Sequence, residues 1–466
     1  MKILLINPHI TNADIYSKYS AGAPCLPPLG LCSLGAVLLE KKHEVRIVDC
    51  AAENIGISQL RQQIDAFMPR VVGVTSTTVS YHAARQVLQV LKESYPEITT
   101  VLGGAHLSAI PLETMKDCET LDIGVVGEGE QTLAEVVERL ESSQPLNGVP
   151  GTLIRYQGAI IQNPVRKPVS DLDATPVPAR HLLKDLRRYS HTPFRGARFT
   201  TTMITSRGCP FQCGYCDQSI FGRKWRAHSA EYVVKEIASL KERYGVEFIS
   251  FEDDNFLLSK NRTIDICREM LGRRLDIGWS CLGRANEVDE EVLPLMKMAG
   301  CSVVYVGIES GSTRILELIN KKLKMEETEK GIRLIKQHGI NVMGSFILGI
   351  PTETRAEMEK TIRLALSLPL DGVSFFMFTP YPGTPLRELA KKHGRVSDDW
   401  RNYSGHPGTL PFVPSGMEEK DLLEVQTRAY RRFLIRPQYL VNHISLFANR
   451  SSISNGLRFL RALVPK

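Results

Sequence analysis

The sequence predicts an α/β protein with three parts: an N-terminal doubly wound domain, a second parallel sheet that forms a partial barrel, and a helical C-terminal region. Short β-branched strands alternate with amphipathic helices over residues 1–145, and six further strand–helix pairs follow Arg198. After Pro380 the pattern becomes helical. Alternation of this kind is typical of parallel sheets that are covered by helices on both faces.

These patterns divide the chain into four segments. We predict a first domain at residues 1–145, a linker at 146–195, a partial barrel at 196–390 and a helical cap at 391–466. A chain of 466 residues is long enough for about three domains.

The composition is that of an ordinary globular protein, with 43% hydrophobic residues. No apolar run is long enough to span a membrane, and the short run Ile3–Ile6 ends at Asn7-Pro8, so it does not resemble a signal peptide. The ten cysteines lack the pattern of a disulfide framework, which predicts a cytoplasmic protein. The net charge of +7 could favour an anionic substrate or a membrane surface, but a mildly basic soluble enzyme is the preferred interpretation.

The first domain is expected to be Rossmann-like. Its predicted strands are Lys2–Asn7, Glu44–Cys50, Val71–Thr77, Thr99–Gly104 and Ile123–Val126. The helices between them are Leu29–Lys42, Ile57–Phe67, Ser80–Ser94 and Gln131–Leu140. Because ligands of such sheets bind beyond the carboxyl ends of the strands, we expect a binding site at the turns Thr75–Thr78, Gly103–His106 and Gly127–Glu130.

The linker is rich in proline, and one hairpin is predicted in it, from Gly151–Tyr156 and Ala159–Asn163. The barrel strands follow as Thr200–Ser206, Phe248–Glu252, Gly278–Leu282, Ser302–Ile308, Asn341–Leu348 and Gly372–Phe378. The barrel helices are Ala230–Arg243, Arg262–Arg273, Glu290–Ala299, Met325–His338 and Arg355–Ser367. Six units are two short of a full barrel, so the mouth is expected to be wide.

The C-terminal region contains an amphipathic segment, Met417–Leu434, and two further segments, Tyr439–Asn449 and Asn455–Val464, that are rich in Arg, Phe and Leu. We interpret them as a helical cap on the barrel, because amphipathic stripes usually face a core. A substrate lid or a peripheral membrane contact is the alternative.

Three cysteines follow the first barrel strand with C-x3-C-x2-C spacing: Cys209, Cys213 and Cys216. A 4Fe–4S cluster normally takes four thiolates, so three would leave one iron with an open position. Zinc is the alternative, but zinc sites use four ligands and the chain has no second C-x2-C pair. Cys267, Cys281 and Cys301 lie in apolar stretches and are expected to be ordinary buried thiols.

This spacing, with the aromatic Tyr215 just before the third cysteine, resembles the radical S-adenosylmethionine (SAM) superfamily. The resemblance implies that the amine and carboxylate of SAM chelate the fourth iron. It also implies that an electron from the cluster cleaves SAM and gives a 5′-deoxyadenosyl radical.

Polar groups follow the other barrel strands, and we expect them to bind SAM. Asp253 lies in the acidic run Glu252–Asp254, and a carboxylate there suits the ammonium of SAM. Arg284 is expected to hold the SAM carboxylate. In the run Val306–Gly311, Gly307 allows close approach of the backbone, while Glu309 and Ser310 suit the ribose or the amine. The alternatives are a solvated turn for the acids and an ion pair for Glu309.

The N-terminal half resembles the cobalamin-binding domains that precede radical SAM barrels. The matching stretches are Pro27–Gly30, Gly73–Thr77, Leu102–His106 and Val126–Glu130. The residues expected to bind cobalamin are Thr75, Ser76, Thr77, Gly103, Gly104, His106, Gly127 and Glu128. The D-x-H-x-x-G motif, whose histidine binds cobalt from below, is absent, so no protein imidazole is expected on cobalt.

A nucleotide-binding domain is a weaker interpretation of this half. No G-x-G-x-x-G motif follows the first strand, and no Walker A motif is present. A degenerate domain with an empty cobalamin site is the other alternative.

The two resemblances together imply a cobalamin-dependent radical SAM methyltransferase with a 4Fe–4S cluster, SAM and cobalamin as cofactors. One SAM would methylate cobalamin, a second would supply the radical, and the substrate radical would take the methyl group. The alternatives are an anaerobic oxidative cyclase of the magnesium-protoporphyrin ester type, a non-catalytic cobalamin sensor, and an RNA methylthiotransferase. The last would need a nucleic-acid module and a strong basic patch, and neither is evident.

The expected partners follow from this function. The substrate is a small molecule such as a lipid, a tetrapyrrole or a natural-product intermediate, and an external electron donor such as flavodoxin or ferredoxin is required. No nucleic acid is expected. The sequence identifies no catalytic side chain beyond those that hold the cofactors.

Overall fold

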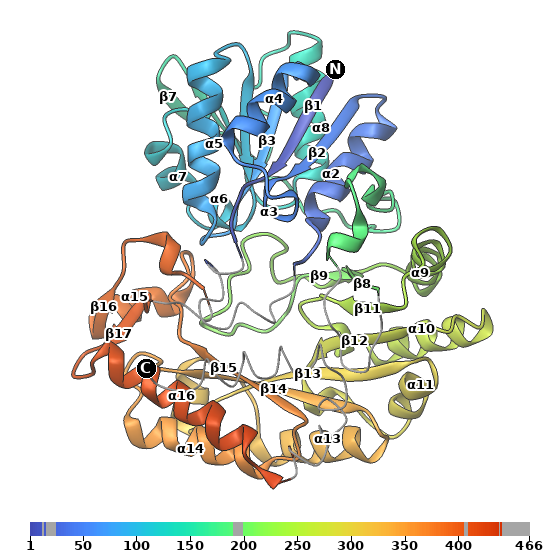
Figure 1. The fold of residues 1–466 in the computed structure, drawn as a ribbon, viewed down its shortest axis with the longest axis vertical. Coiled ribbons are helices and arrows are strands. Elements are labelled where there is room, and N and C mark those ends of the chain that lie inside the picture. Colours follow the sequence, from blue (N-terminus) through green and yellow to red (C-terminus); the bar gives the residue numbers. More distant parts are fainter. Residues whose placement is uncertain (12–13, 15–24, 190–198, 405–408, 438, 440–466) are drawn as a thin grey trace.

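The computed structural model describes residues 1–11, 14, 25–189, 199–404, 409–437 and 439. Two α/β sheets lie one above the other, with the N-terminal sheet at the top and the barrel sheet at the bottom of Figure 1. The α/β fold class predicted from the sequence is confirmed.

The first sheet has seven strands in the order β2-β1-β3-β4-β5-β6-β7. Their bounds are β1 Lys2–Asn7, β2 Glu44–Asp49, β3 Val71–Thr75, β4 Thr99–Gly103, β5 Ile123–Val125, β6 Thr152–Tyr156 and β7 Ala159–Gln162. Strands β1 to β5 are parallel. The chain reverses direction across the sheet between β1 and β3, and this switch point is where an open sheet binds its ligand.

The hairpin β6–β7 lies in the segment predicted as a linker, yet it belongs to this sheet. Strand β6 pairs antiparallel with β5, and β7 pairs antiparallel with β6. The first sheet therefore continues to Gln162.

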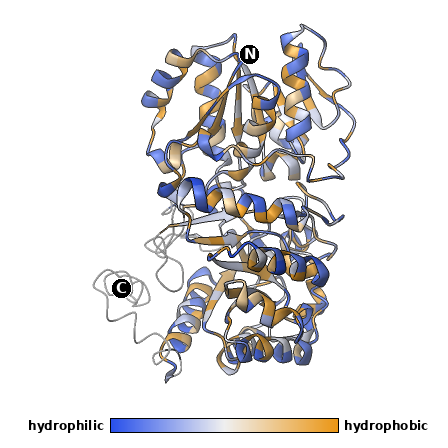
Figure 2. Ribbon diagram, turned by 90° about the vertical axis from the view of Figure 1, so that its right-hand side faces the viewer, coloured by the Kyte–Doolittle hydropathy of each residue, from blue (hydrophilic) through white to orange (hydrophobic). Residues whose placement is uncertain are grey.

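The helices of the first domain are α2 Leu29–Glu40, α3 Cys50–Glu53, α4 Ile57–Phe67, α5 Tyr81–Ser94, α6 Ala105–Ala109, α7 Pro111–Asp117 and α8 Glu130–Glu141. Helix α4 shows why the pattern was predictable, because its buried residues Leu60, Ile64 and Phe67 recur at helical spacing. Figure 2 shows the same mixture of hydrophilic and hydrophobic residues along the other helices. The short helices α3, α6 and α7 were not predicted.

The second sheet is fully parallel and has the order β8-β11-β12-β13-β14-β15. Its strands are β8 Thr200–Met203, β11 Phe248–Phe251, β12 Gly278–Gly283, β13 Cys301–Glu309, β14 Asn341–Leu348 and β15 Gly372–Met377. Its helices are α9 Ala230–Tyr244, α10 Lys260–Gly272, α11 Val292–Met298, α12 Thr313–Leu318, α13 Met325–Gln337 and α14 Arg355–Ser367. The predicted six-unit partial barrel is confirmed, and α12 is an unpredicted addition.

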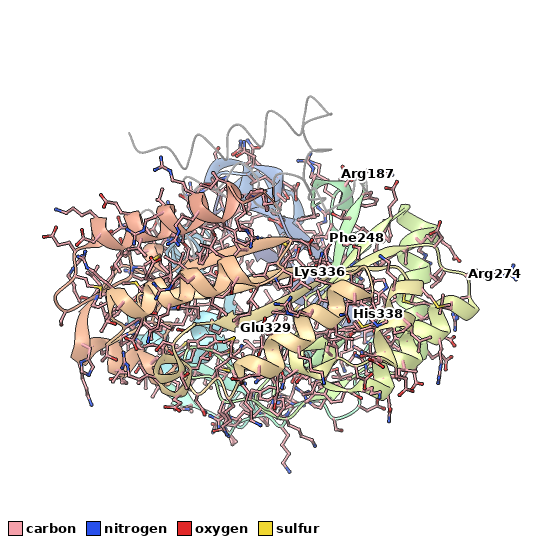
Figure 3. The ribbon with its side chains drawn as sticks, turned by 90° about the horizontal axis from the view of Figure 1, so that it is seen from below. Arg187, Phe248, Arg274, Glu329, Lys336 and His338 are labelled. Atoms are coloured by element: carbon pink, nitrogen blue, oxygen red, sulfur yellow. The ribbon has the colours of Figure 1, made fainter. Side chains whose placement is uncertain are left out.

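An ion pair lies at the end of the barrel far from the first domain. Lys336, on α13, pairs with Asp371 at 2.6 Å, and the same carboxylate accepts a hydrogen bond from the amide of Val342 at 2.8 Å. Figure 3, drawn from below, shows Lys336 on this side of the barrel. The opposite end of the barrel, at the carboxyl ends of the strands, faces the first domain and is where a binding site is expected.

The C-terminal region contains helices α15 Pro385–His393 and α16 Glu419–Leu434, together with two short strands, β16 Gly394–Val396 and β17 Phe412–Pro414. This antiparallel strand pair was not predicted. Helix α16 covers the edge strand β15, because Tyr430 and Gln426 bond to the backbone of Phe375 at 3.0 and 2.7 Å.

The segments Tyr439–Asn449 and Asn455–Val464 lie beyond the described residues except for Tyr439. Within the described ranges, no helix is both long and apolar enough to cross a bilayer.

Candidate active site between the two domains

The barrel strands end at a wide cavity that the first domain closes from above. It holds about 1850 Å³ of empty space, including its open mouth. The three cysteines line it, as do the predicted residues Tyr215, Arg284, Gly307 and Glu309. Thr77, Thr78 and Val79 line it from the first domain, just after β3. The cysteine loop and the ligand-binding edge of the first sheet therefore face one cavity.

A glycine and several hydrogen bonds to the backbone fix the conformation of the cysteine loop. Gly208 has a φ of 84°, and a Cβ there would lie 2.5 Å from the carbonyl oxygen of Lys224, so no larger residue fits. The side chain of Gln218 donates to the carbonyls of Cys209 and Phe211 at 2.8 and 2.9 Å. The amide of Gly214 donates to Ile319 at 2.8 Å, which ties the loop to the end of α12.

The thiols fit an iron–sulfur cluster. Burial raises the pKa of Cys209, and burial followed by the charge of Asp254 raises the pKa of Cys216 to about 12. To ionise, Cys209 and Cys216 therefore need strong positive charge beside them, and cluster irons supply it. No three Cys, His, Asp or Glu side chains of the described residues converge closely enough to hold a single metal ion.

Glu309 ends β13 and belongs to a buried polar cluster with Tyr215 and Lys321. Its carboxylate accepts hydrogen bonds from the Tyr215 hydroxyl and the Lys321 ammonium, both at 2.8 Å, and the ammonium lies 3.2 Å from the tyrosine oxygen. Glu309 has a φ of 69°, a conformation uncommon for residues other than glycine. A Cβ at Gly307 would lie 2.4 Å from this carboxylate, so the glycine leaves room for the cluster.

Arg284 lines the same cavity. Its guanidinium lies 3.9 Å from the ring centre of Phe211 and donates to the carbonyls of Lys321 and Lys322 at 3.1 and 2.9 Å. Its Nε is buried and has no hydrogen-bond partner among the described residues. A carboxylate ligand in the cavity would satisfy that donor.

Asp253 and Ser310 do not line the cavity, and a direct contact with SAM does not fit their positions. Asp253 is 1% exposed and accepts hydrogen bonds from the backbone and hydroxyl groups of Thr205 and Ser206. Ser310 is fully buried against Thr361 at 3.2 Å. Both residues support the walls of the site.

Asp254 and Asn255 line the cavity in place of Asp253. Burial, and then the charge of Asp253, raise the pKa of Asp254. Asn255 donates to the carboxylate of Glu287 at 2.8 Å.

A second cavity, of about 1210 Å³, lies between the carboxyl end of the first sheet and the barrel. Five residues predicted to bind cobalamin line it: Thr75, Gly103, Gly104, Gly127 and Glu128. Gly104 has a φ of 99°, and a Cβ there would lie 2.4 Å from the carbonyl oxygen of Ser76. The slot has apolar walls, including Leu5, Leu29 and Val101, which suits a large organic cofactor tail.

Ser76 and His106 line neither of these cavities. His106 is 1% exposed, stacks on Tyr81 with 4.1 Å between ring centres, and meets the edge of Trp400 at 5.2 Å. Trp400 belongs to the C-terminal region, so His106 joins the two halves of the molecule. Contact with cobalamin does not fit this position.

The buried His106 makes stability depend on pH. Burial lowers the pKa of His106 from 6.5 to about 4. Between these two pH values the imidazole is protonated in the unfolded chain and neutral in the folded protein. The resulting stability is present above pH 6.5 and is lost as the pH falls towards 4. We expect wild type to lose about 1–2 kcal/mol more than His106→Phe between pH 7 and pH 5. Urea unfolding of both proteins at the two pH values measures this, and equal losses would contradict it.

Glu128 lines the second cavity, but its carboxylate forms ion pairs within the protein. Its carboxylate pairs with Arg207 at 2.8 Å and with Arg226 at 2.6 Å, and Arg207 also pairs with Glu130 at 2.7 Å. All four side chains are at most 10% exposed. Arg207 lies two residues before Cys209, so this interdomain ion-pair cluster links the turn Gly127–Glu130 of the first domain to the cysteine loop.

Breaking this cluster is expected to be costly. Arg207→Met leaves two buried carboxylates with one cationic partner, and we expect the apparent free energy of unfolding to fall by about 3 kcal/mol. Urea denaturation measures the loss. The matched control is Arg333→Met, which breaks an exposed pair with Glu329 and is expected to change stability by no more than about 0.5 kcal/mol. Equal effects of the two variants would show that the cluster contributes no special stability.

Several residues of the site were not predicted from the sequence. They are Lys321, Asp254, Asn255, Arg207, Arg226 and the aromatic wall of Tyr305, Phe376, Tyr381 and Tyr403. Position at a strand end could have indicated Asp254, Asn255 and Phe376, whereas Lys321 and Tyr403 come from irregular segments.

Each half of the chain matches a known protein family. Residues 203–365 match the Radical SAM superfamily, and residues 22–137 match the B12 binding domain. An uncharacterized methyltransferase of Pyrococcus horikoshii is 36% identical over 447 residues, which is 95% of each chain. The anaerobic magnesium-protoporphyrin IX monomethyl ester cyclase of Rubrivivax gelatinosus is 29% identical over 452 residues, covering 94% of this chain and 78% of the cyclase.

A solved structure supports the fold. The radical SAM methyltransferase TsrM of Kitasatospora setae, with cobalamin and a [4Fe–4S] cluster bound, has a TM-score of 0.73 at 20% identity, covering 94% of this chain and 89% of TsrM. The near full-length match to the Pyrococcus protein, together with the two domain matches, establishes the family. This chain belongs to the cobalamin-dependent radical SAM enzymes, whose cofactors are a 4Fe–4S cluster, SAM and cobalamin.

Proposed function

We propose that this protein is a methyltransferase that moves a methyl group to an unactivated carbon or phosphorus atom of a small organic substrate. The observation that carries the proposal is the shared cavity, which the cysteine loop lines on one side and Thr77–Val79 of the first domain on the other. A substrate between them would meet groups held by both domains.

The chain's own residues bind and orient. We propose that Cys209, Cys213 and Cys216 hold the cluster, that Arg284 holds the SAM carboxylate, and that Glu309 and Tyr215 bind the rest of SAM. Thr75, Gly103, Gly104 and Gly127 would hold cobalamin. When bound, these cofactors supply a 5′-deoxyadenosyl radical and a transferable methyl group. The walls of the cavity exclude water and position the substrate.

The substrate class is proposed from the cavity and the relatives. Tyr305, Phe376, Phe378 and Met377 give one wall an apolar character, which suits an organic ring or chain. The Rubrivivax relative is named for a magnesium-protoporphyrin ester, so a tetrapyrrole is one substrate to test. An external one-electron donor would be required.

Oxidative cyclisation is the second candidate function, because the Rubrivivax relative is a cyclase. The masses of the products distinguish methylation from cyclisation. The anaerobically reconstituted protein is incubated with a mixture of small molecules, methyl-deuterated SAM and heavy-oxygen water, and the products are analysed by mass spectrometry. Methylation predicts product ions that carry the deuterated methyl group, and cyclisation predicts ions that carry heavy oxygen. Heavy oxygen without labelled methyl would overturn the proposal.

A further inference from the structure

The outer side of the cysteine loop reaches the surface. Pro210, Gln212 and Cys216 are exposed, whereas Cys209 and Cys213, which line the cavity, are only partly accessible. Each of the three cysteines is therefore either exposed itself or next in sequence to an exposed residue. An electron that enters from a protein partner would arrive there.

Basic side chains flank this part of the loop on two sides. Arg223 and Lys224 are exposed, and their backbone lies against the loop, since the carbonyl oxygen of Gly222 accepts from the amide of Cys209 at 3.3 Å. Arg223 also donates to Gln218, the residue that holds the loop carbonyls. Lys322 is exposed on the other side, where its carbonyl accepts from Arg284 beneath Phe211.

These three cations are not neutralised by the described residues. None of them forms an ion pair there, in contrast to Lys324, which pairs with Glu327 at 3.0 Å. Of the neighbouring acids, Asp217 and Glu287 are partly buried and accept hydrogen bonds from Ser219 and Asn255, and Asp254 lines the cavity. The surface beside the loop therefore presents exposed positive charge without an ion-pair partner, which attracts an acidic partner.

We propose that Arg223, Lys224 and Lys322, around the tip Pro210–Gln212, form the docking surface for an acidic one-electron donor protein. The inference rests on the proposed function, because it assumes a cluster at the three cysteines. In the docked pair one electron passes from the donor to the cluster, so the donor is oxidised by one electron and the cluster is reduced by one. The basic residues act on the encounter and not on the chemistry.

The test measures cluster reduction directly. Wild type and the variant Arg223→Glu/Lys224→Glu/Lys322→Glu are reconstituted anaerobically, and bleaching of the cluster absorbance is followed by stopped flow. With reduced flavodoxin at about 10 mM ionic strength, the variant is expected to react at least about 10-fold more slowly, because the reversed charges remove electrostatic steering. Raising the ionic strength to about 300 mM is expected to slow wild type and bring the two rates together.

Two controls separate this proposal from the others. Dithionite, a small reductant that needs no protein docking, is expected to reduce both proteins at equal rates. Arg274→Glu reverses a charge in the turn before β12, at the edge of the molecule in Figure 3, and is expected to leave the flavodoxin rate unchanged. Equal flavodoxin rates for wild type and the triple variant at low ionic strength would overturn the docking surface. Normal reduction without 5′-deoxyadenosine in the presence of SAM would overturn the proposed function instead.

Discussion

Replacing Cys213 by alanine is expected to reduce 5′-deoxyadenosine formation to the background of the assay. The side chain lines the cavity at the centre of the cysteine loop, between the other two thiols in sequence. A cluster left with two protein thiolates loses the ligand set that keeps one iron open for SAM. Anaerobic reconstitution with iron, sulfide and cobalamin, followed by chromatography of the SAM cleavage products, gives the measurement.

The matched control for Cys213→Ala is Cys267→Ala. Cys267 is fully buried in the barrel core on α10 and lines neither cavity, so its loss is expected to leave cleavage near the wild-type rate. Cleavage that is equal in wild type and in Cys213→Ala would reject the cluster assignment. Loss of cleavage in both variants would indicate general damage to the barrel.

The sheets were predictable because their strands are short, buried and β-branched, and because helices separate them at regular intervals. Every strand predicted for the two sheets is present. Helices α3, α6, α7 and α12 were missed because four to seven residues give too little periodicity to detect. The pair β16–β17 joins residues far apart in sequence, with three residues in each strand, so it has no local signal.

The site was predictable only to within one residue at the strand ends. Successive side chains of a strand point to opposite sides, so the sequence locates the acidic run after β11 but not which acid enters the cavity. Asp253 points into the wall and Asp254 into the cavity. Glu128 illustrates a second limit, because its partners Arg207 and Arg226 lie in another domain and no local pattern indicates them.

Lys321 was not predicted as a site residue from the sequence. Its replacement is expected to reduce both the stability of the protein and its affinity for SAM. Lys321 is 7% exposed, and among the described residues its ammonium is the one cation that pairs with Glu309. Lys321→Met leaves the buried carboxylate with only the Tyr215 hydroxyl. We expect the apparent free energy of unfolding to fall by about 3 kcal/mol, since removing one partner of a buried pair costs about 3–5 kcal/mol.

The same substitution is expected to weaken SAM binding, because an unpaired Glu309 carboxylate would leave its position and release Tyr215. We expect the KM for SAM in 5′-deoxyadenosine formation to rise at least about tenfold, while the absorbance of the reconstituted cluster stays close to that of wild type.

The double variant Lys321→Met/Glu309→Gln distinguishes stability from function. It removes both charges, so it is expected to recover most of the lost stability, because replacing both members of a buried pair is far less costly than removing one. It is not expected to recover SAM binding, since the proposed role needs the carboxylate itself. Recovery of both properties would show that Glu309 only balances the charge of Lys321 and takes no part in binding SAM. Recovery of stability alone would place Lys321 as the residue that positions Glu309 and Tyr215 for the cofactor.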